Sequence, residues 1–258
     1  MNSADTQFAY TGDYFLKQVD GFAEFADFTA DPSQLFPRYR RNRELLGLEP
    51  IHTFLDIGCG RGEQVMTHSK LGGPATGIDY SGSAIQIARA KAAQLGLRCE
   101  FIEGSFESLD GSHRYDRIMA SEFIEHISAK EGARFFFLAL QLLNPGGRLL
   151  VYTHPNVLQR RVGYKLQRFL YQLATGKRMP AVQPDTTSEH YLLYHLNEQS
   201  FRSLRSLARG AGFRRVRLGY DTCFPPPKSH LGRLFRLFTH HTPLRHFFLT
   251  DLVCIAEK

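Results

Sequence analysis

The chain has 258 residues, of which 43% are hydrophobic, so it is long and apolar enough to form one large domain with a core of its own. No apolar run reaches the roughly 18 residues of a membrane span, which excludes a transmembrane helical protein. The net charge of +7 is uneven: residues 157–258 hold 17 basic and 6 acidic residues, whereas residues 1–156 hold 15 and 19. This basic second part indicates either an anionic partner or a solvated basic face.

The N-terminus and the cysteine pattern predict a cytoplasmic protein. Residues 1–13 lack the basic and apolar regions of a secretory signal. The four cysteines lie far apart and form no CxxC pair, so we expect reduced thiols rather than a disulfide or zinc framework. These cysteines are Cys59, Cys99, Cys223 and Cys254.

Residues 1–49 are predicted to form a helical and aromatic segment ahead of the main domain. Eight aromatic residues fall within residues 1–36 without a clean period, which is typical of a segment that packs over another part of the protein. It is either a lid over an active site or a helix packed on the surface. The sequence Pro37–Leu48 predicts a basic helix that ends near Gly47.

From residue 50 onward, apolar strands alternate with helices. The predicted strands are His52–Ile57, Ala75–Tyr80, Leu97–Ile102, Tyr115–Ser121 and Arg148–Thr153. The predicted helices are Glu63–Leu71, Ala84–Leu95 and a third that Ser128 caps and that ends at Leu143. This alternation predicts an α/β fold with a parallel sheet covered by helices on both faces.

After Pro155 the alternation stops. A basic, aromatic, amphipathic helix is predicted at Val157–Thr175, and residues 176–190 are predicted to be a loop. A helix at Glu198–Ala211 and strands at Phe213–Gly219 and Thr250–Glu257 complete the chain. We therefore expect one domain over residues 50–258, with an inserted helical segment at 156–195.

A glycine-rich turn follows the first predicted strand, in the sequence FLDIGCGRGE that begins at Phe54. Glycines let a backbone turn sharply and approach a ligand closely. Asp79 ends the next strand, at a distance along the chain from which an acid reaches ribose hydroxyls. The glycines do not follow G-x-G-x-x-G, and Asp56 at the mouth of the turn would repel a pyrophosphate and attract a cationic group.

Five segments, LDIGCGRGE, GIDYS, FIEGSFESL, YDRIMASEFIEHI and LLNPGGRLLVYTHPN, resemble the ordered motifs of class I S-adenosylmethionine (SAM)-dependent methyltransferases. The resemblance covers roughly residues 50–156, and the occurrence of these motifs together in this order makes it specific. Within the family, the chain resembles the ubiquinone-pathway O-methyltransferase-like group. It implies a Rossmann-like, seven-stranded, mostly parallel sheet with helices on both faces, in which the last hairpin strand is antiparallel. SAM is then expected across the carboxyl ends of the strands, with S-adenosylhomocysteine (SAH) as product.

The resemblance implies roles at the methionine end of SAM. The backbone of Gly58, Cys59 and Gly60 contacts the methionine part, and Asp56 faces its ammonium group. Arg38, Arg40 and Arg41 of the predicted helix 37–48 either clamp the carboxylate of SAM or belong to a surface helix.

At the adenosine end, the resemblance implies that Asp79 holds the ribose diol and that Tyr80 stacks near the adenine. Many family members carry an acid after the third strand that receives the adenine amine. Here Ser105 occupies that position, followed by Phe106, so the hydrogen bond expected there is weaker.

Ser121 and Glu122 end the fourth predicted strand and are expected to border the sulfonium. Methyl transfer requires an acceptor aligned with the S–CH₃ bond and a base when the acceptor is a hydroxyl. The candidate catalytic residues are Glu122, Glu125, His126 and His154, with His126 favoured as the general base.

Glu122, Glu125 and His126 form E-x-x-E-H, whose side chains share one face if the segment is helical. Such a face suits a divalent cation. The pattern is similar to that of ubiquinone-pathway O-methyltransferases and of small-RNA 2′-O-methyltransferases. Resemblance to the latter group implies a later histidine as a further ligand, a place that His195 or His190 would take. A metal-free arrangement is favoured, in which the Glu125–His126 pair caps a helix or orients the substrate.

The motifs specify the methyl donor and leave the acceptor open. A hydroxyl of a small molecule is favoured: a metabolite, a sugar or a lipid-linked intermediate, with an anionic acceptor suiting the basic second part. The aromatic N-terminus and the insertion 156–195 are then expected to form the acceptor pocket. The alternatives are an RNA 2′-O-methyltransferase and a non-catalytic SAM-binding partner subunit. Peripheral membrane contact through the basic and apolar segment His230–Phe248 is a further hypothesis. The sequence does not set the oligomeric state.

Overall fold

The computed structural model describes residues 15–16, 22–109, 111–183, 191, 195–221, 233, 237 and 243–258. The strands are β1 (Phe54–Ile57), β2 (Ala75–Asp79), β3 (Glu100–Glu103), β4 (Tyr115–Ser121), β5 (Leu143–Thr153), β6 (Arg215–Tyr220) and β7 (Leu252–Glu257). The α-helices are α2 (Phe22–Phe25), α3 (Pro37–Leu46), α4 (Glu63–Lys70), α5 (Gly82–Gln94), α6 (Ala129–Leu142), α7 (Tyr164–Thr175), α9 (Phe201–Ala211) and α11 (Arg245–Phe248). Short 3₁₀ helices are η2 (Pro32–Gln34), η3 (Phe106–Ser108) and η4 (Ile124–His126), and η5 (Gln159–Gly163) is a π-helical turn.

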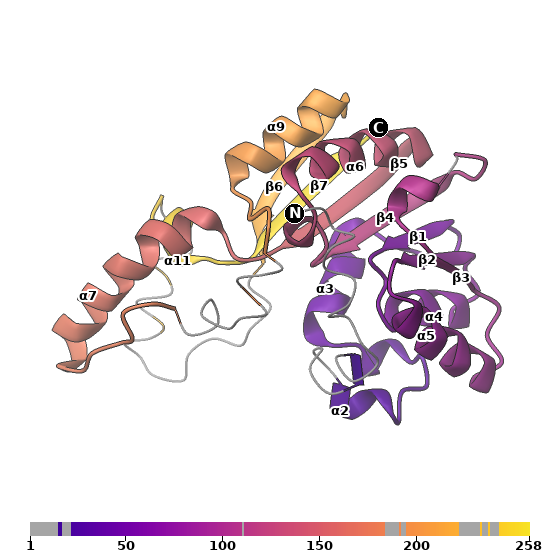
Figure 1. The fold of residues 1–258 in the computed structure, drawn as a ribbon, viewed down its shortest axis with the longest axis horizontal. Coiled ribbons are helices and arrows are strands. Elements are labelled where there is room, and N and C mark those ends of the chain that lie inside the picture. Colours follow the sequence, from indigo (N-terminus) through magenta and orange to yellow (C-terminus); the bar gives the residue numbers. More distant parts are fainter. Residues whose placement is uncertain are drawn as a thin grey trace.

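The strands of the described residues form one seven-stranded sheet in the order β3-β2-β1-β4-β5-β7-β6 (Figure 1). Strands β1 to β5 are parallel to their neighbours, and β7 is antiparallel to both β5 and β6. The expected Rossmann-like fold is confirmed. The strand order reverses between β1 and β4, and ligands of open α/β sheets bind outside the carboxyl ends of the strands at such a point.

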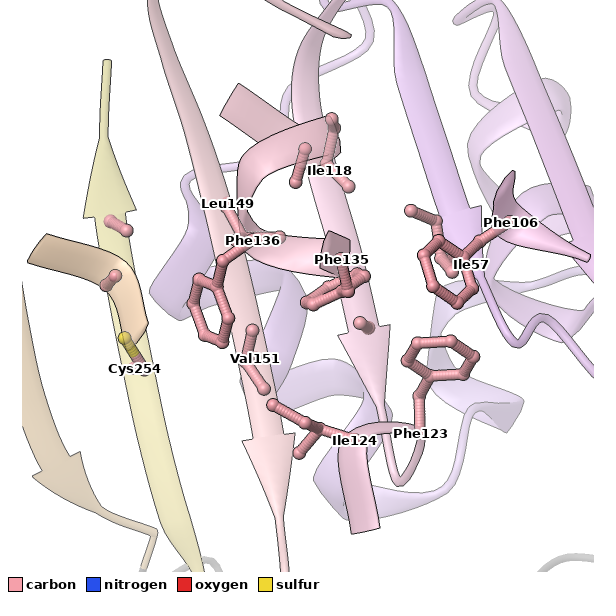
Figure 2. Close-up of a cluster of buried hydrophobic side chains, with 14 of the residues drawn as sticks. Ile57, Phe106, Ile118, Phe123, Ile124, Phe135, Phe136, Leu149, Val151 and Cys254 are labelled. Atoms are coloured by element: carbon pink, nitrogen blue, oxygen red, sulfur yellow. The ribbon is translucent and has the colours of Figure 1, made fainter. Parts of the chain in front are cut away.

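Alternate residues of the central strands supply two separate cores. On β5, Leu149 and Val151 join the core that contains residues of α6 and α9, whereas Leu150 and Tyr152 join the core that contains residues of α3, α4 and α5. Figure 2 shows the first core, where aromatic rings of α6 lie over β4 and β5. Both faces of the sheet are therefore filled, which leaves the strand ends for ligands.

Strand β5 begins earlier than the sequence predicts. The segment Asn144–Gly147 (NPGG) lies between the predicted helix, which ends at Leu143, and the predicted strand Arg148–Thr153, so the sequence indicates a turn there. In the structure Leu143 already pairs with Tyr115 of β4. A shift of register between Tyr115 and Arg117 lets the segment bulge within the strand instead of leaving the sheet. The predicted helix before it is confirmed, and the Ser128–Glu131 capping box begins it.

After β5 the chain leaves the sheet. Helix α7 projects away from it, together with α11 (Figure 1). The predicted helix 157–175 is confirmed, with a π-helical turn ahead of α7. None of the described helices is long and apolar enough to cross a lipid bilayer. Most of the proposed membrane segment 230–248 and most of residues 184–194 lie outside the described residues.

Candidate active site

The turn after β1 requires its glycines. Gly58, Gly60 and Gly62 have φ angles of 74°, 52° and 82°, in the left-handed region that L-residues avoid. A Cβ atom on Gly58 would lie 2.9 Å from the ring of Phe123, and one on Gly62 would lie 2.4 Å from the ring of Phe101. The glycine pattern in the sequence therefore reflects both backbone conformation and close packing.

Asp79, at the end of β2, holds this turn in place. Its Oδ2 atom accepts a hydrogen bond from the backbone N–H of Gly60 at 3.0 Å, and its Oδ1 atom accepts one from the N–H of Ser81 at 2.9 Å. The N–H of Cys59 donates to the carbonyl of Ile78, which ties the turn to β2 a second time. Burial raises the pKa of Asp79, and the two backbone hydrogen bonds oppose that rise.

Asp56 is buried near the end of β1, with 4% of its surface exposed. Burial, together with the negative charges of Glu63 and Asp79, raises the pKa of Asp56 to about 8, against the attraction of Arg43. A cation bound in front of this carboxyl would favour its charged form. The role of Asp56 at an ammonium group stays a prediction from the sequence, since Asp56 is not among the residues that line the adjacent pocket at the strand ends.

A pocket of about 560 Å³ lies at the carboxyl ends of β1, β2 and β3. Of the predicted cofactor residues, it brings together Gly58, Asp79, Tyr80, Ser105 and Phe106. The Ser105 hydroxyl accepts the backbone N–H of residue 107 and caps η3, a partner that the sequence did not predict.

Aromatic rings form one wall of this pocket. Phe106 and Phe123 both line it, with ring centroids 5.6 Å apart. Phe135 of α6 packs against both rings, with its ring centroid 5.9 Å from that of Phe106 and 5.3 Å from that of Phe123 (Figure 2). The wall is thus continuous with the hydrophobic core, which fixes its position.

A cluster of carboxylates and imidazoles lies at the carboxyl ends of β4 and β5. The Nδ1 atom of His154 lies 3.0 Å from Oε1 of Glu122 and 4.0 Å from Oε1 of Glu125. The ring of His195 lies 4.9 Å from that of His126 and 6.0 Å from that of His154. The structure therefore gathers all four predicted catalytic residues, and places His195 beside them.

The charges of this cluster are set by their neighbours. Burial favours neutral Glu122, but the positive charges of Arg38, at 2.6 Å, and of His154 hold its pKa at about 2. Burial disfavours charged His154, but the carboxylates of Glu122, 3.0 Å from Nδ1, and of Glu125 raise its pKa to about 9. Burial raises the pKa of Glu125 to about 7, although Thr153 donates a hydrogen bond to it at 2.9 Å. At neutral pH, Glu122 is an anion and His154 is a cation.

The predicted single helical face for E-x-x-E-H is wrong. The chain turns sharply at Glu122, whose φ is 54°, and η4 covers less than one full α-helical turn. Glu125 is fully buried, whereas His126 packs against His195. Within the described part of the chain, no three or more His, Cys, Asp or Glu side chains are grouped so that they could hold a metal ion. His190 lies outside that part.

Helix α3 supplies Arg38, which the sequence offered as part of a possible ligand clamp, and Asn42, which the sequence did not place at the site. Arg38 is buried and forms the ion pair with Glu122, and Asn42 donates a hydrogen bond to the hydroxyl of Ser121 at 3.1 Å. Arg40 and Arg41, the other two arginines of the possible ligand clamp, are exposed, whereas Arg38 is buried. Arg38 and Asn42 are four residues apart and so share a helix face, which is the signal that could have separated them from their neighbours.

Comparisons with known proteins agree with the fold. Residues 54–147 match the sequence profile of a methyltransferase domain. The chain is 32% identical over 114 residues to a ubiquinone biosynthesis O-methyltransferase of Methylobacterium sp. (strain 4-46). The aligned region covers 43% of this chain and 45% of that protein. It is 32% identical over 111 residues to the mitochondrial protein of the same name from Schizosaccharomyces pombe, 42% of this chain and 40% of the relative. The match thus spans less than half the length of these curated relatives.

Solved structures resemble a larger part of the chain. Magnesium protoporphyrin IX methyltransferase from Synechocystis PCC 6803, solved with bound SAH, superposes with a TM-score of 0.53 at 16% identity, over 86% of this chain and 83% of that one. A SAM-dependent methyltransferase from Archaeoglobus fulgidus superposes with a TM-score of 0.52 at 17% identity, over 86% and 93% of the two chains. At such low identity, the likeness establishes the fold alone.

Proposed function

We propose that the chain, whose residues 54–147 match a methyltransferase domain, is a class I SAM-dependent enzyme that transfers the methyl group of SAM to a hydroxyl of a small-molecule acceptor. The observation that carries the proposal is the contact of His154 with Glu122, 3.0 Å apart at the strand ends. An imidazole oriented by a carboxylate is the usual arrangement of a general base that takes a hydroxyl proton. The relatives named O-methyltransferases support an oxygen acceptor.

The pocket beside Asp79 suits the adenosine part of SAM. Its volume of about 560 Å³ lies within the roughly 300–1,000 Å³ of small-molecule sites. An ionised carboxylate has about four lone-pair sites, and two backbone N–H groups occupy two of those on Asp79. The others can accept the two hydroxyls of a ribose, while Tyr80 and Phe106 offer aromatic surface and Ser105 a polar edge to the base.

The methionine part would then extend over the glycine turn. The backbone of Gly58, Cys59 and Gly60 would contact it, and Asp56 would ionise against its ammonium group. SAM supplies an electrophilic methyl group on a sulfonium. Bordering that sulfonium would be Glu122, whose carboxylate is already ionised at neutral pH because its pKa is about 2.

We assign the role of general base to His154 rather than to His126. Nδ1 of His154 faces Glu122, so Nε2 is the atom that takes the acceptor proton. The carboxylates of Glu122 and Glu125 would stabilise the resulting imidazolium. The side chain of His154 is 38% exposed, so an acceptor can approach it. A bound sulfonium near Glu122 would lower the pKa of His154 from about 9 and so increase its basic fraction at neutral pH.

We do not propose the metal-dependent RNA reaction as a second function. It needs a cation among Glu122, Glu125, His126 and His195, and the described residues contain no group arranged to hold one. His126 and His195 are instead assigned to positioning, since their rings pack edge to face.

The experiment that tests the proposal offers the protein SAM with a labelled methyl group and two fractions of a cell extract, small molecules and RNA. We expect label on oxygen in a small molecule, with unchanged yield in the presence of a chelator. Label only on nitrogen or carbon, label in RNA, or SAM binding without transfer to either fraction would contradict the proposal. The last outcome would favour a non-catalytic SAM-binding subunit.

A further inference from the structure

Helix α7 and the turn before it carry a stripe of apolar side chains that face solvent. Val162, Leu166, Phe169 and Leu173 are 48%, 37%, 61% and 69% exposed. Their spacing of i, i+4, i+7 and i+11 places them on one face of a helix. An amphipathic helix of a globular protein normally turns such a face towards the core. Here the apolar face points away from it.

The opposite face of this helix is the one that anchors it. Tyr164 is buried, and its hydroxyl donates a hydrogen bond to the carbonyl of Pro180 at 3.2 Å. Gly163 packs so tightly against α11 that a Cβ atom would lie 1.6 Å from the carbonyl oxygen of Phe247. Figure 1 shows α7 projecting from the body of the protein, and the exposed fractions of the four apolar side chains show that the stripe faces solvent.

The surroundings of the stripe are basic. Residues 157–184 contain six Lys and Arg and no Asp or Glu. Arg161 and Lys165 are exposed and flank the stripe on one side, while Lys177 and Arg178 are exposed just beyond the end of the helix. The face therefore combines an apolar centre with a cationic edge.

We propose that this face of α7 docks on the surface of a membrane that contains anionic phospholipid. A helix of this kind lies in the interface, with its apolar face in the headgroup and acyl boundary and its basic residues on the lipid phosphates. RNA would neutralise the basic residues but would leave Leu166, Phe169 and Leu173 in water. A second copy of the chain would bring two acid-free basic helices together, which charge repulsion opposes.

This surface lies outside the proposed methyltransferase site and does not depend on it. It also differs from the segment 230–248 that the sequence suggested for membrane contact.

Co-sedimentation with vesicles tests the proposal. The probes are vesicles of phosphatidylcholine alone and of phosphatidylcholine with phosphatidylglycerol. We expect binding to the anionic vesicles that weakens with salt, and at least a tenfold loss in Phe169→Glu. Lys165→Glu should weaken binding several-fold. The matched control is Phe137→Glu on α6, because Phe137 is 54% exposed and Phe169 61%. That control should bind as the wild type does.

Several results would overturn the inference. One is the absence of binding to the anionic vesicles, or equal binding to the two kinds of vesicle. Another is unchanged vesicle binding in Phe169→Glu, or a loss of binding in Phe137→Glu as large as that in Phe169→Glu. A dimer in ultracentrifugation that Phe169→Glu dissociates would make the stripe an interface between copies. RNA binding that Phe169→Glu abolishes would make it a nucleic-acid surface. Unchanged SAH binding in each variant shows that the fold is intact, and vesicle binding is read independently of methyl transfer.

Discussion

Glu122 lies between two cations, with Oε1 3.0 Å from Nδ1 of His154 and Oε2 2.6 Å from the guanidinium of Arg38. The three residues come from the end of β4, the residue after β5 and helix α3. Because both partners are positively charged, Glu122 stays ionised although it is largely buried. The carboxylate can therefore orient a base and face the cationic sulfonium of SAM without changing its own protonation state.

The first prediction concerns the titration of His154. Its pKa of about 9 rests on Glu122, so Glu122→Gln should lower it by at least one unit. The imidazole of the wild type then loses its proton near pH 9, and that of the variant at lower pH. NMR titration of the His154 ring in the ligand-free protein measures both values. Equal values in the two proteins would show that Glu122 does not control this histidine.

The second prediction separates the two candidate bases. His154→Asn should lower kcat by about 10²–10⁴-fold, the usual contribution of a general base, while SAH binding is retained. His126→Asn should lower it much less, because the ring of His126 packs against His195, whereas Glu122 orients His154. Steady-state rates with the identified acceptor provide the comparison. A larger loss in His126→Asn would reverse the assignment.

A third prediction concerns the pair that joins α3 to β4. Removing one partner of a largely buried ion pair costs about 3 kcal/mol or more, so Arg38→Met should destabilise the protein by about 3 kcal/mol. In the double variant Arg38→Met/Glu122→Gln, the loss in free energy of unfolding should be smaller than the sum of the two single losses. The reason is that the double variant leaves no buried charge without a partner of opposite charge. Urea unfolding of the two single variants and the double variant measures the coupling. Additive losses would mean that the 2.6 Å contact has no energetic weight.

The glycine turn gives a fourth prediction with an internal control. Gly62 and Gly96 both have left-handed φ angles, 82° and 65°, but only a Cβ on Gly62 would meet a neighbour, the ring of Phe101. Gly96→Ala should therefore lower the free energy of unfolding by about 1–2 kcal/mol, the cost of a left-handed backbone at an L-residue. Gly62→Ala should cost that plus overpacking, roughly 2–5 kcal/mol in all. Urea unfolding compares the two, and equal losses would rule out the packing role of Gly62.

The features predicted correctly from the sequence are those that depend on local rules. A left-handed turn needs glycine, so Gly58, Gly60 and Gly62 indicated the turn together with the strand before them and the helix and strand after them. The strands of a covered parallel sheet are apolar runs between helices, so their order was visible as well. The position of Asp79 followed from its place at the end of such a run.

The parts that sequence reasoning missed depend on contacts between distant segments. Arg38 and Glu122 are 84 residues apart, and nothing in either segment indicates the other. The E-x-x-E-H pattern fits a helix by spacing alone, but the tertiary contacts of Glu122 hold it in a conformation that interrupts one. The choice between His126 and His154 therefore needed the fold.

The central claim is that Asp79 and the glycine turn bind the adenosine part of SAM. Calorimetric titration with SAH, which cannot react further, tests it most directly in the wild type and in Asp79→Asn. We predict one-to-one binding to the wild type and an affinity at least tenfold weaker in the variant, which loses the charge that accepts the ribose hydroxyls. Because Asn keeps one acceptor oxygen where Asp79 accepts the N–H groups of Gly60 and Ser81, the unfolding midpoint of the variant should fall, and the titration is made at a temperature at which both proteins are folded. The absence of binding to the folded wild type, or the same Kd in both proteins, would contradict the account.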